Sequence, residues 1–145
     1  MSLGYSDGDV PVGYVSPPFP SLLFNLSENP YTSALLFYAW DIYVFTVYWF
    51  LIFSIGMHFV IVSVIIAVNY KRNIANQATL LIIFLSYIVC GAFYGYVLGS
   101  FVGLLLGAIY RAGALHMSTW VPFTWALGVM MFTIFSSYEF STIDM

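Results

Sequence analysis

The chain has 145 residues, of which 62% are hydrophobic and only 6% are charged, and this composition excludes a water-soluble globular domain. The net charge of −3, with three basic residues in all, excludes an electrostatic nucleic-acid interface. Because its apolar runs are long enough for membrane-spanning helices, the sequence predicts an all-α integral membrane protein with three spans.

The first segment, residues 1–32, is expected to be an extended or irregular arm. Five of the six prolines lie in it, and proline removes backbone donors and fixes φ. Aromatic and leucine side chains in the same segment predict that the arm lies along the membrane surface or against a partner. It lacks the basic start and apolar centre of a cleavable signal peptide. Asn25-Leu26-Ser27 is a glycosylation sequon.

The first apolar run, residues 33–68, contains only Asp41 and His58 as interruptions. As a single helix this run would be about 54 Å long, against a hydrocarbon core of about 30 Å. We therefore expect residues 34–43 at the membrane interface and the span proper at about 44–68.

His58 lies deep in the predicted first span, and Ser54 lies one turn earlier on the same helix face. An ionisable group at membrane depth is costly and usually points into the bundle or a wet cavity. Two interpretations stay open: a neutral imidazole hydrogen-bonded between helices, or a polar contact in a proton or lipid-headgroup path. No second histidine or carboxylate stands at metal-ligand spacing, so the sequence predicts no metal site.

The second apolar run, residues 78–110, has no charged side chain and is predicted to form one long, tilted helix. It carries a row of glycines at intervals of four: Gly91, Gly95, Gly99, Gly103 and Gly107. In lipid, such small residues allow close backbone contact between helices. The row fits either a packing groove or a lipid path, and the sequence leaves both open. Cys90 is expected to be a buried packing thiol.

The second hydrophilic turn covers residues 111–118, and the third span is predicted at 120–137, followed by a short tail at 138–145. Arg111 ends the glycine-bearing helix, where a cation is favoured by the helix dipole. A guanidinium also matches phosphate oxygens, so a lipid phosphate contact is an equal alternative. Gly113 is expected to act as a left-handed cap.

The basic residues predict the orientation in the membrane. Lys71-Arg72, in the turn between the first two spans, outweighs the single Arg111 and places that turn in the cytosol. The amino terminus then faces the lumen and the carboxyl terminus the cytosol. The sequon at Asn25 lies on the same lumenal arm and agrees with this orientation.

The sequence does not predict an enzyme or a bound cofactor. The serines have no neighbouring histidine–acid arrangement, and no glycine-rich phosphate loop follows a strand.

Several short motifs follow one another in a distinctive order. Trp49 is followed nine positions later by His58, then come Lys71-Arg72, Tyr110-Arg111-Ala112-Gly113 and Pro122-Phe123. This series resembles the transmembrane protein 170 family of small, three-span endoplasmic reticulum proteins, over roughly residues 40–137. The chain departs from the family pattern in having extra residues between Arg111 and Pro122.

The resemblance implies a role in endoplasmic reticulum and nuclear envelope organisation. It also implies phospholipid scrambling in association with a bridge-like lipid transfer protein, whose withdrawal of lipid from one leaflet creates an area mismatch. His58 and Arg111 are carried over as polar lipid contacts, with Ser54 facing the same path. Two alternatives stay open: a non-catalytic structural subunit that docks another membrane protein through the glycine row, and a membrane-shaping protein.

Overall fold

Three long helices make up most of the molecule. The computed structural model describes residues 14–22, 35–72, 76–113 and 115–143. The helices are α2 (Ala39–Arg72), α3 (Gln77–Ala112) and α4 (Trp120–Ile143), and two short strands are β1 (Leu35–Leu36) and β2 (Met117–Ser118). Each helix is long and apolar enough to cross a membrane, which confirms the predicted all-α, three-span fold.

The first two helices are longer than a bilayer core is thick. The 34 residues of α2 and 36 residues of α3 correspond to about 51 Å and 54 Å, against about 30 Å of hydrocarbon. As expected, α3 is one unbroken helix that carries the whole glycine row. The third helix, α4, continues to Ile143, into the segment expected to be a tail.

Charged residues lie at the helix ends where the helix dipole favours them, but the predicted cap at Gly113 is not found. Asp41 lies in the first turn of α2, where the helix dipole favours an acid, and Arg111 lies in the last turn of α3. The prediction that Gly113 is a left-handed cap is wrong, because its φ is −85° and its ψ is −2°. Its N–H instead donates to the Ile109 carbonyl at 3.0 Å, which continues the helical hydrogen-bond pattern.

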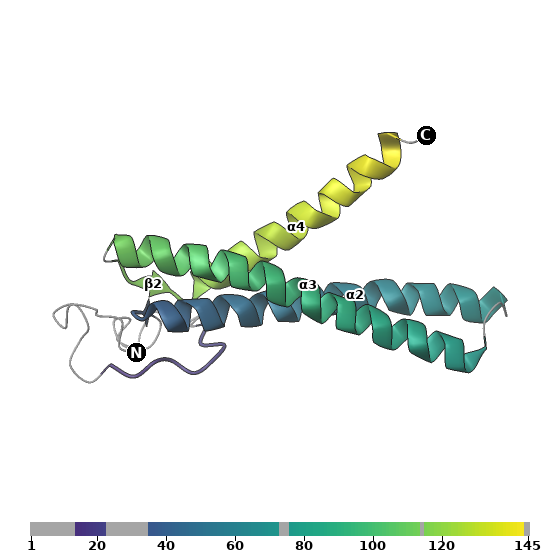
Figure 1. Ribbon diagram of the computed structural model, residues 1–145, viewed down its shortest axis with the longest axis horizontal. Coiled ribbons are helices and arrows are strands. Elements are labelled where there is room, and N and C mark those ends of the chain that lie inside the picture. The colour runs from purple at the N-terminus through teal and green to yellow at the C-terminus, as the bar shows by residue number, and fades with distance from the viewer. Residues whose placement is uncertain (1–13, 23–34, 73–75, 114, 144–145) are drawn as a thin grey trace.

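α2 and α3 form an antiparallel hairpin, and α4 diverges from it. α2 and α3 lie side by side along their length, whereas α4 contacts the first half of α2 and then leaves the hairpin (Figure 1). β1 and β2 pair antiparallel, with Leu35 opposite Ser118 and Leu36 opposite Met117. We call the end that carries this pair the sheet end, and the opposite end, where α2 leads into α3, the turn end.

The buried apolar side chains gather in the sheet-end half. One cluster joins the strands to the helices: Leu36, Ile42, Phe45, Leu106 and Met117. A second cluster lies where α4 crosses α2 and contains Phe50, Ala126 and Met130. Packing against α4 is therefore confined to the sheet-end half, and towards the turn end the hairpin depends on contacts between α2 and α3.

Candidate functional site

The five glycines of α3 are all buried and lie against α2. Their neighbours on α2 are His58 at Gly91, Ser54 and Phe50 at Gly95, Phe50 and Val47 at Gly99, Tyr43 at Gly103, and Ala39 at Gly107. We call this contact the α2–α3 seam. In this conformation α2 fills the row, so lipid would enter it only if the two helices separated.

The seam is tightest near its middle. A Cβ built at Gly95 would lie 2.7 Å from the Ser54 Cβ and 2.9 Å from the Phe50 carbonyl oxygen, whereas at Gly107 the nearest atom is 3.4 Å away. The first distances are too short for any side chain, and the last is an ordinary contact. The backbones approach each other so closely at Gly95 that only glycine fits there. At Gly107 the spacing is wider, so glycine is much less necessary.

Among the residues that the structure describes, two polar contacts cross the seam. The Ser54 hydroxyl donates to the Gly91 carbonyl at 2.7 Å, and the Tyr43 and Ser100 hydroxyls lie 3.1 Å apart. Hydrogen bonds between membrane helices contribute about 0.6 kcal/mol on average, so they support the seam without dominating it. Ser54 is fully buried, and its hydroxyl is engaged between helices rather than presented to lipid.

His58 lies at the edge of the same seam and is half-buried. Its Nδ1 is 2.8 Å from the Ser54 carbonyl oxygen. Because a carbonyl only accepts, Nδ1 carries the proton in this contact, which leaves Nε2 as the acceptor whenever the ring holds a single proton. The backbone of α2 thus fixes both the tautomer and the direction of the imidazole.

Two tyrosines of α3 flank this histidine. The ring centroids of Tyr87 and Tyr94 each lie 6.3 Å from that of His58, and both tyrosines are more than a third exposed. They are seven residues apart, on one face of α3 with Gly91 between them. We call His58, Tyr87 and Tyr94 the polar edge. It lies near the middle of the hairpin along its length, and polar groups are most costly near the middle of a bilayer.

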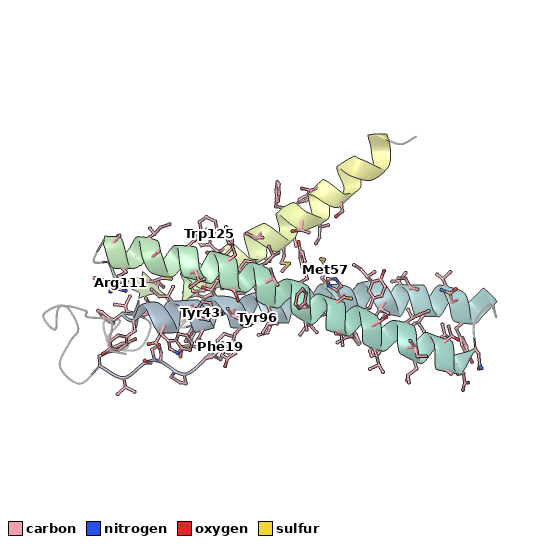
Figure 2. All side chains as sticks on the ribbon, viewed as in Figure 1. Phe19, Tyr43, Met57, Tyr96, Arg111 and Trp125 are labelled. Atoms are coloured by element: carbon pink, nitrogen blue, oxygen red, sulfur yellow. The ribbon has the colours of Figure 1, made fainter. Side chains whose placement is uncertain are left out.

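The structure brings together some of the candidate residues and separates others. Ser54 and His58 both contact Gly91, whereas Arg111 is exposed and lies at the sheet end (Figure 2). Asn25 lies outside the described residues. The expectation of a buried thiol at Cys90 is wrong, since Cys90 is exposed, because each helical residue turns about 100° from the last and Gly91 already occupies the seam.

Tyr87 and Tyr94 share a helix with the glycines, so hydroxyl donors beside the groove were expected from the sequence, but their position on either side of His58 was not. Their seven-residue spacing around a glycine was the available signal, but nothing in the sequence showed which face of α2 would meet it. Among the residues that the structure describes, no group of three or more His, Cys, Asp or Glu side chains could hold a metal ion.

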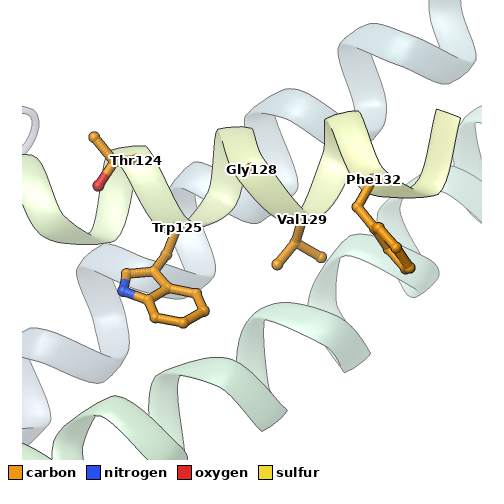
Figure 3. A pocket seen from close by; sticks show the side chains of 5 residues that line it. All are labelled: Thr124, Trp125, Gly128, Val129 and Phe132. Atoms are coloured by element: carbon orange, nitrogen blue, oxygen red, sulfur yellow. The ribbon is translucent and has the colours of Figure 1, made fainter. Parts of the chain in front are cut away.

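A separate apolar hollow of about 280 Å³ lies on α4. Figure 3 shows the residues that line it: Thr124, Trp125, Gly128, Val129 and Phe132. A Cβ built at Gly128 would meet no atom within 4 Å, so this glycine, unlike those of the seam, faces open space.

Known proteins are similar to this chain over the three helices that form the seam, the polar edge and the hollow. A family model described as "Transmembrane protein 170A/B-like" matches residues 35–143. The "Uncharacterized protein YPR153W" of Saccharomyces cerevisiae is 38% identical over 134 residues, which cover 92% of each chain. No solved structure matches the chain. The matched region includes the seam, the polar edge and α4.

Proposed function

Because the chain belongs to the transmembrane protein 170A/B-like family, we propose that this multi-pass membrane protein supports phospholipid scrambling in the endoplasmic reticulum, without enzymatic activity. The observation that carries the proposal is the polar edge. An imidazole and two phenols stand together near the middle of a hairpin whose other outward side chains are mainly apolar.

A phospholipid that changes leaflet must move its polar headgroup through hydrocarbon while its tails stay in lipid. Unpaired polar groups in hydrocarbon cost several kcal/mol, so a path that offers hydrogen-bond partners lowers the barrier. Tyrosine hydroxyls donate to phosphate oxygens, and the His58 Nε2 adds an acceptor for headgroup donors. The seam supports this role indirectly, because its close packing holds His58 at the hairpin surface.

The proposal includes a partner and an orientation. With the Lys71-Arg72 turn in the cytosol and the amino terminus in the lumen, a bridge-like lipid transfer protein would draw lipid from the cytosolic leaflet. Scrambling by this protein would then rebalance the two leaflets. Arg111, exposed at the sheet end, is the proposed contact for a lipid phosphate on the lumenal side.

Reconstitution tests the activity directly. Purified protein in vesicles with a fluorescent phospholipid should let a membrane-impermeant quencher reach the inner-leaflet pool, while empty vesicles protect about half of the signal. His58→Leu keeps an apolar side chain against Gly91 and removes the ring nitrogens, so the rate should fall about tenfold, the effect of about 1.4 kcal/mol on a barrier. A wild-type rate equal to that of empty vesicles would refute the proposal.

The hollow on α4 favours a second candidate function, that of a structural subunit for another membrane protein. Gly128 leaves room for close approach of a neighbouring helix, and helix interfaces in membranes favour small residues. Co-elution with a large partner in mild detergent, together with no scrambling by the isolated protein, would support this second function over the first.

A further inference from the structure

The indole Nε1–H of Trp49 is buried and has no hydrogen-bond partner among the described residues. Buried donors are nearly always paired, and each exception calls for an explanation. Trp49 lies where three parts of the chain meet. Its ring centroid is 4.8 Å from that of Phe123 on α4 and 5.1 Å from that of Phe19, which precedes the helices.

Phe19 belongs to a segment, residues 14–22, that runs along the outside of α2 (Figure 2). We call this segment the strap. The Phe19 ring also contacts Phe45 and Tyr48, at centroid distances of 5.5 Å and 5.3 Å. The strap therefore covers the face of α2 that carries Trp49.

The strap is held to the bundle by side chains. Its hydrogen bonds are Tyr14 Oη to the Leu35 carbonyl at 2.9 Å, Ser16 Oγ to Asp41 Oδ2 at 2.5 Å, and Thr119 Oγ1 to the Ser21 carbonyl at 2.9 Å. Among the described residues, no backbone–backbone hydrogen bond joins the strap to a helix or strand. The strap can therefore leave without breaking any helix or the β1–β2 pair.

The depth of Trp49 suits a contact with lipid ester groups. If α2, at about 51 Å, is centred on a core of about 30 Å, roughly seven residues project at each end. The hydrocarbon then begins near residue 46, and Trp49 lies about 5 Å inside it. Tryptophan is enriched at this boundary because its N–H bonds to polar groups while its ring stays apolar.

We propose that Trp49 is a lipid-binding residue whose Nε1–H donates to a glycerol-ester carbonyl of a phospholipid, and that the strap closes this site when seated. Three observations support this inference. The Nε1–H of Trp49 has no hydrogen-bond partner among the described residues, and Trp49 is placed near the hydrocarbon boundary. The strap, which is tethered by side chains, covers this residue. The site is separate from the polar edge, so it stands or falls independently of scrambling.

A disulfide reporter measures how often the strap is seated. In a Cys90→Ala background, which removes the exposed native thiol, Ser16→Cys and Asp41→Cys place two thiols where a hydrogen bond now lies. The rate of disulfide formation with diamide follows the seated fraction. We expect disulfide formation to be about fivefold slower in diester than in diether phosphatidylcholine vesicles. A hydrogen bond of typical strength from Trp49 to the lipid ester would stabilise the state in which the strap is not seated.

Matched tryptophan variants identify the donor. Trp49→Phe should abolish the difference between the two lipids, whereas Trp40→Phe, at an exposed position, should keep it. Equal rates in both lipids with Trp49 present, or a difference that survives Trp49→Phe, would overturn the proposal.

A second measurement keeps Trp49 in place, in case its substitution prevents folding. In the reporter chain with Trp40→Phe, Trp120→Phe and Trp125→Phe, the emission of Trp49 should lie at longer wavelength in diester than in diether vesicles. Locking the disulfide should remove this shift. An emission spectrum that is the same in both lipids before locking would also overturn the proposal.

Discussion

At the scale of single residues, the glycines of α3 differ in how much room the neighbouring helix leaves them. Gly91, Gly95 and Gly99 face α2 atoms within 3.0 Å of a built Cβ, whereas Gly107 has ordinary spacing. The five glycines share one sequence spacing, but close packing requires glycine more strictly at some of these positions than at others. The seam is an interhelical contact whichever function the protein has.

This inequality predicts opposite outcomes for two similar substitutions. Gly95→Ala should destabilise the protein by about 1–3 kcal/mol, since overpacking forces the backbones apart. Gly107→Ala should be neutral or stabilising by up to about 1 kcal/mol, because alanine favours the helix. Thermal unfolding in detergent measures both. Equal melting temperatures for the two variants would show that the seam is looser than described.

Tyr14 gives the strap a predicted pH dependence. Burial raises the pKa of Tyr14 above its ordinary value of 10.0, and the nearby Asp41 carboxylate adds to the rise. The raised pKa means that the fold favours the neutral phenol, which donates to Leu35. This contribution to stability is complete below pH 10 and is lost as the pH rises through the raised pKa.

The measurement is a titration of the ¹³Cζ signal of Tyr14 in tyrosine-labelled protein, assigned by its absence in Tyr14→Phe. The midpoint should lie above pH 10. A midpoint at or below pH 10 would contradict the burial of Tyr14 against the bundle.

At the scale of the elements, α4 is attached through a short contact and then leaves the hairpin (Figure 1). Ala126 and Met130 pack against Phe50, whereas Gly128, on another face, meets nothing within 4 Å. The attachment of α4 therefore depends on a few closely packed side chains.

Two substitutions to the same residue test this attachment. Ala126→Phe should lower stability by about 1–3 kcal/mol or more, because Ala126 is fully buried and the extra ring has no space. Gly128→Phe should have a much smaller effect, since its position is open. The fraction of monodisperse protein after heating, measured by size-exclusion chromatography, compares them. A larger loss for Gly128→Phe would contradict the packing of α4.

The sequence predicted the positions of the helices better than it predicted which of their faces pack together. Long apolar runs defined the helices, and the glycine spacing marked the face of α3 where either packing or a lipid path was expected. The matching face of α2 was not predictable, because α2 is apolar on all sides and its sequence has no distinct stripe. The two-residue strands are too short to leave a periodic signal, and the seating of Phe19 on α2 depends on tertiary contact alone.

At the scale of the whole molecule, a hairpin of about 51–54 Å must tilt or project from a core of about 30 Å. Such tilting also fits the membrane-shaping alternative, in which the hairpin alters bilayer thickness or curvature. The strap, both strands and the start of α4 lie at the sheet end (Figure 1), so they would meet the same membrane surface. We predict that this surface is lumenal, opposite the Lys71-Arg72 turn.

Glycosylation tests this orientation. Asn25 should carry a glycan in cells, so endoglycosidase treatment should shift the wild-type chain and leave Asn25→Gln and Ser27→Ala unchanged. A chain without a glycan at Asn25, but modified at a sequon engineered into the α2–α3 turn, would show the reverse orientation.

The central claim is that the polar edge lowers the barrier for a lipid headgroup within the membrane. The most direct measurement compares scrambling rates of the reconstituted double variant Tyr87→Phe/Tyr94→Phe with those of Tyr96→Phe. Tyr96 is exposed on the same helix but lies off the Tyr87–Tyr94 face, so each variant removes only hydroxyls. We predict a loss of about fivefold to tenfold for the double variant, as expected for about 1 kcal/mol or more of lost hydrogen bonding, and no loss for Tyr96→Phe. Equal rates for the two variants would contradict the claim.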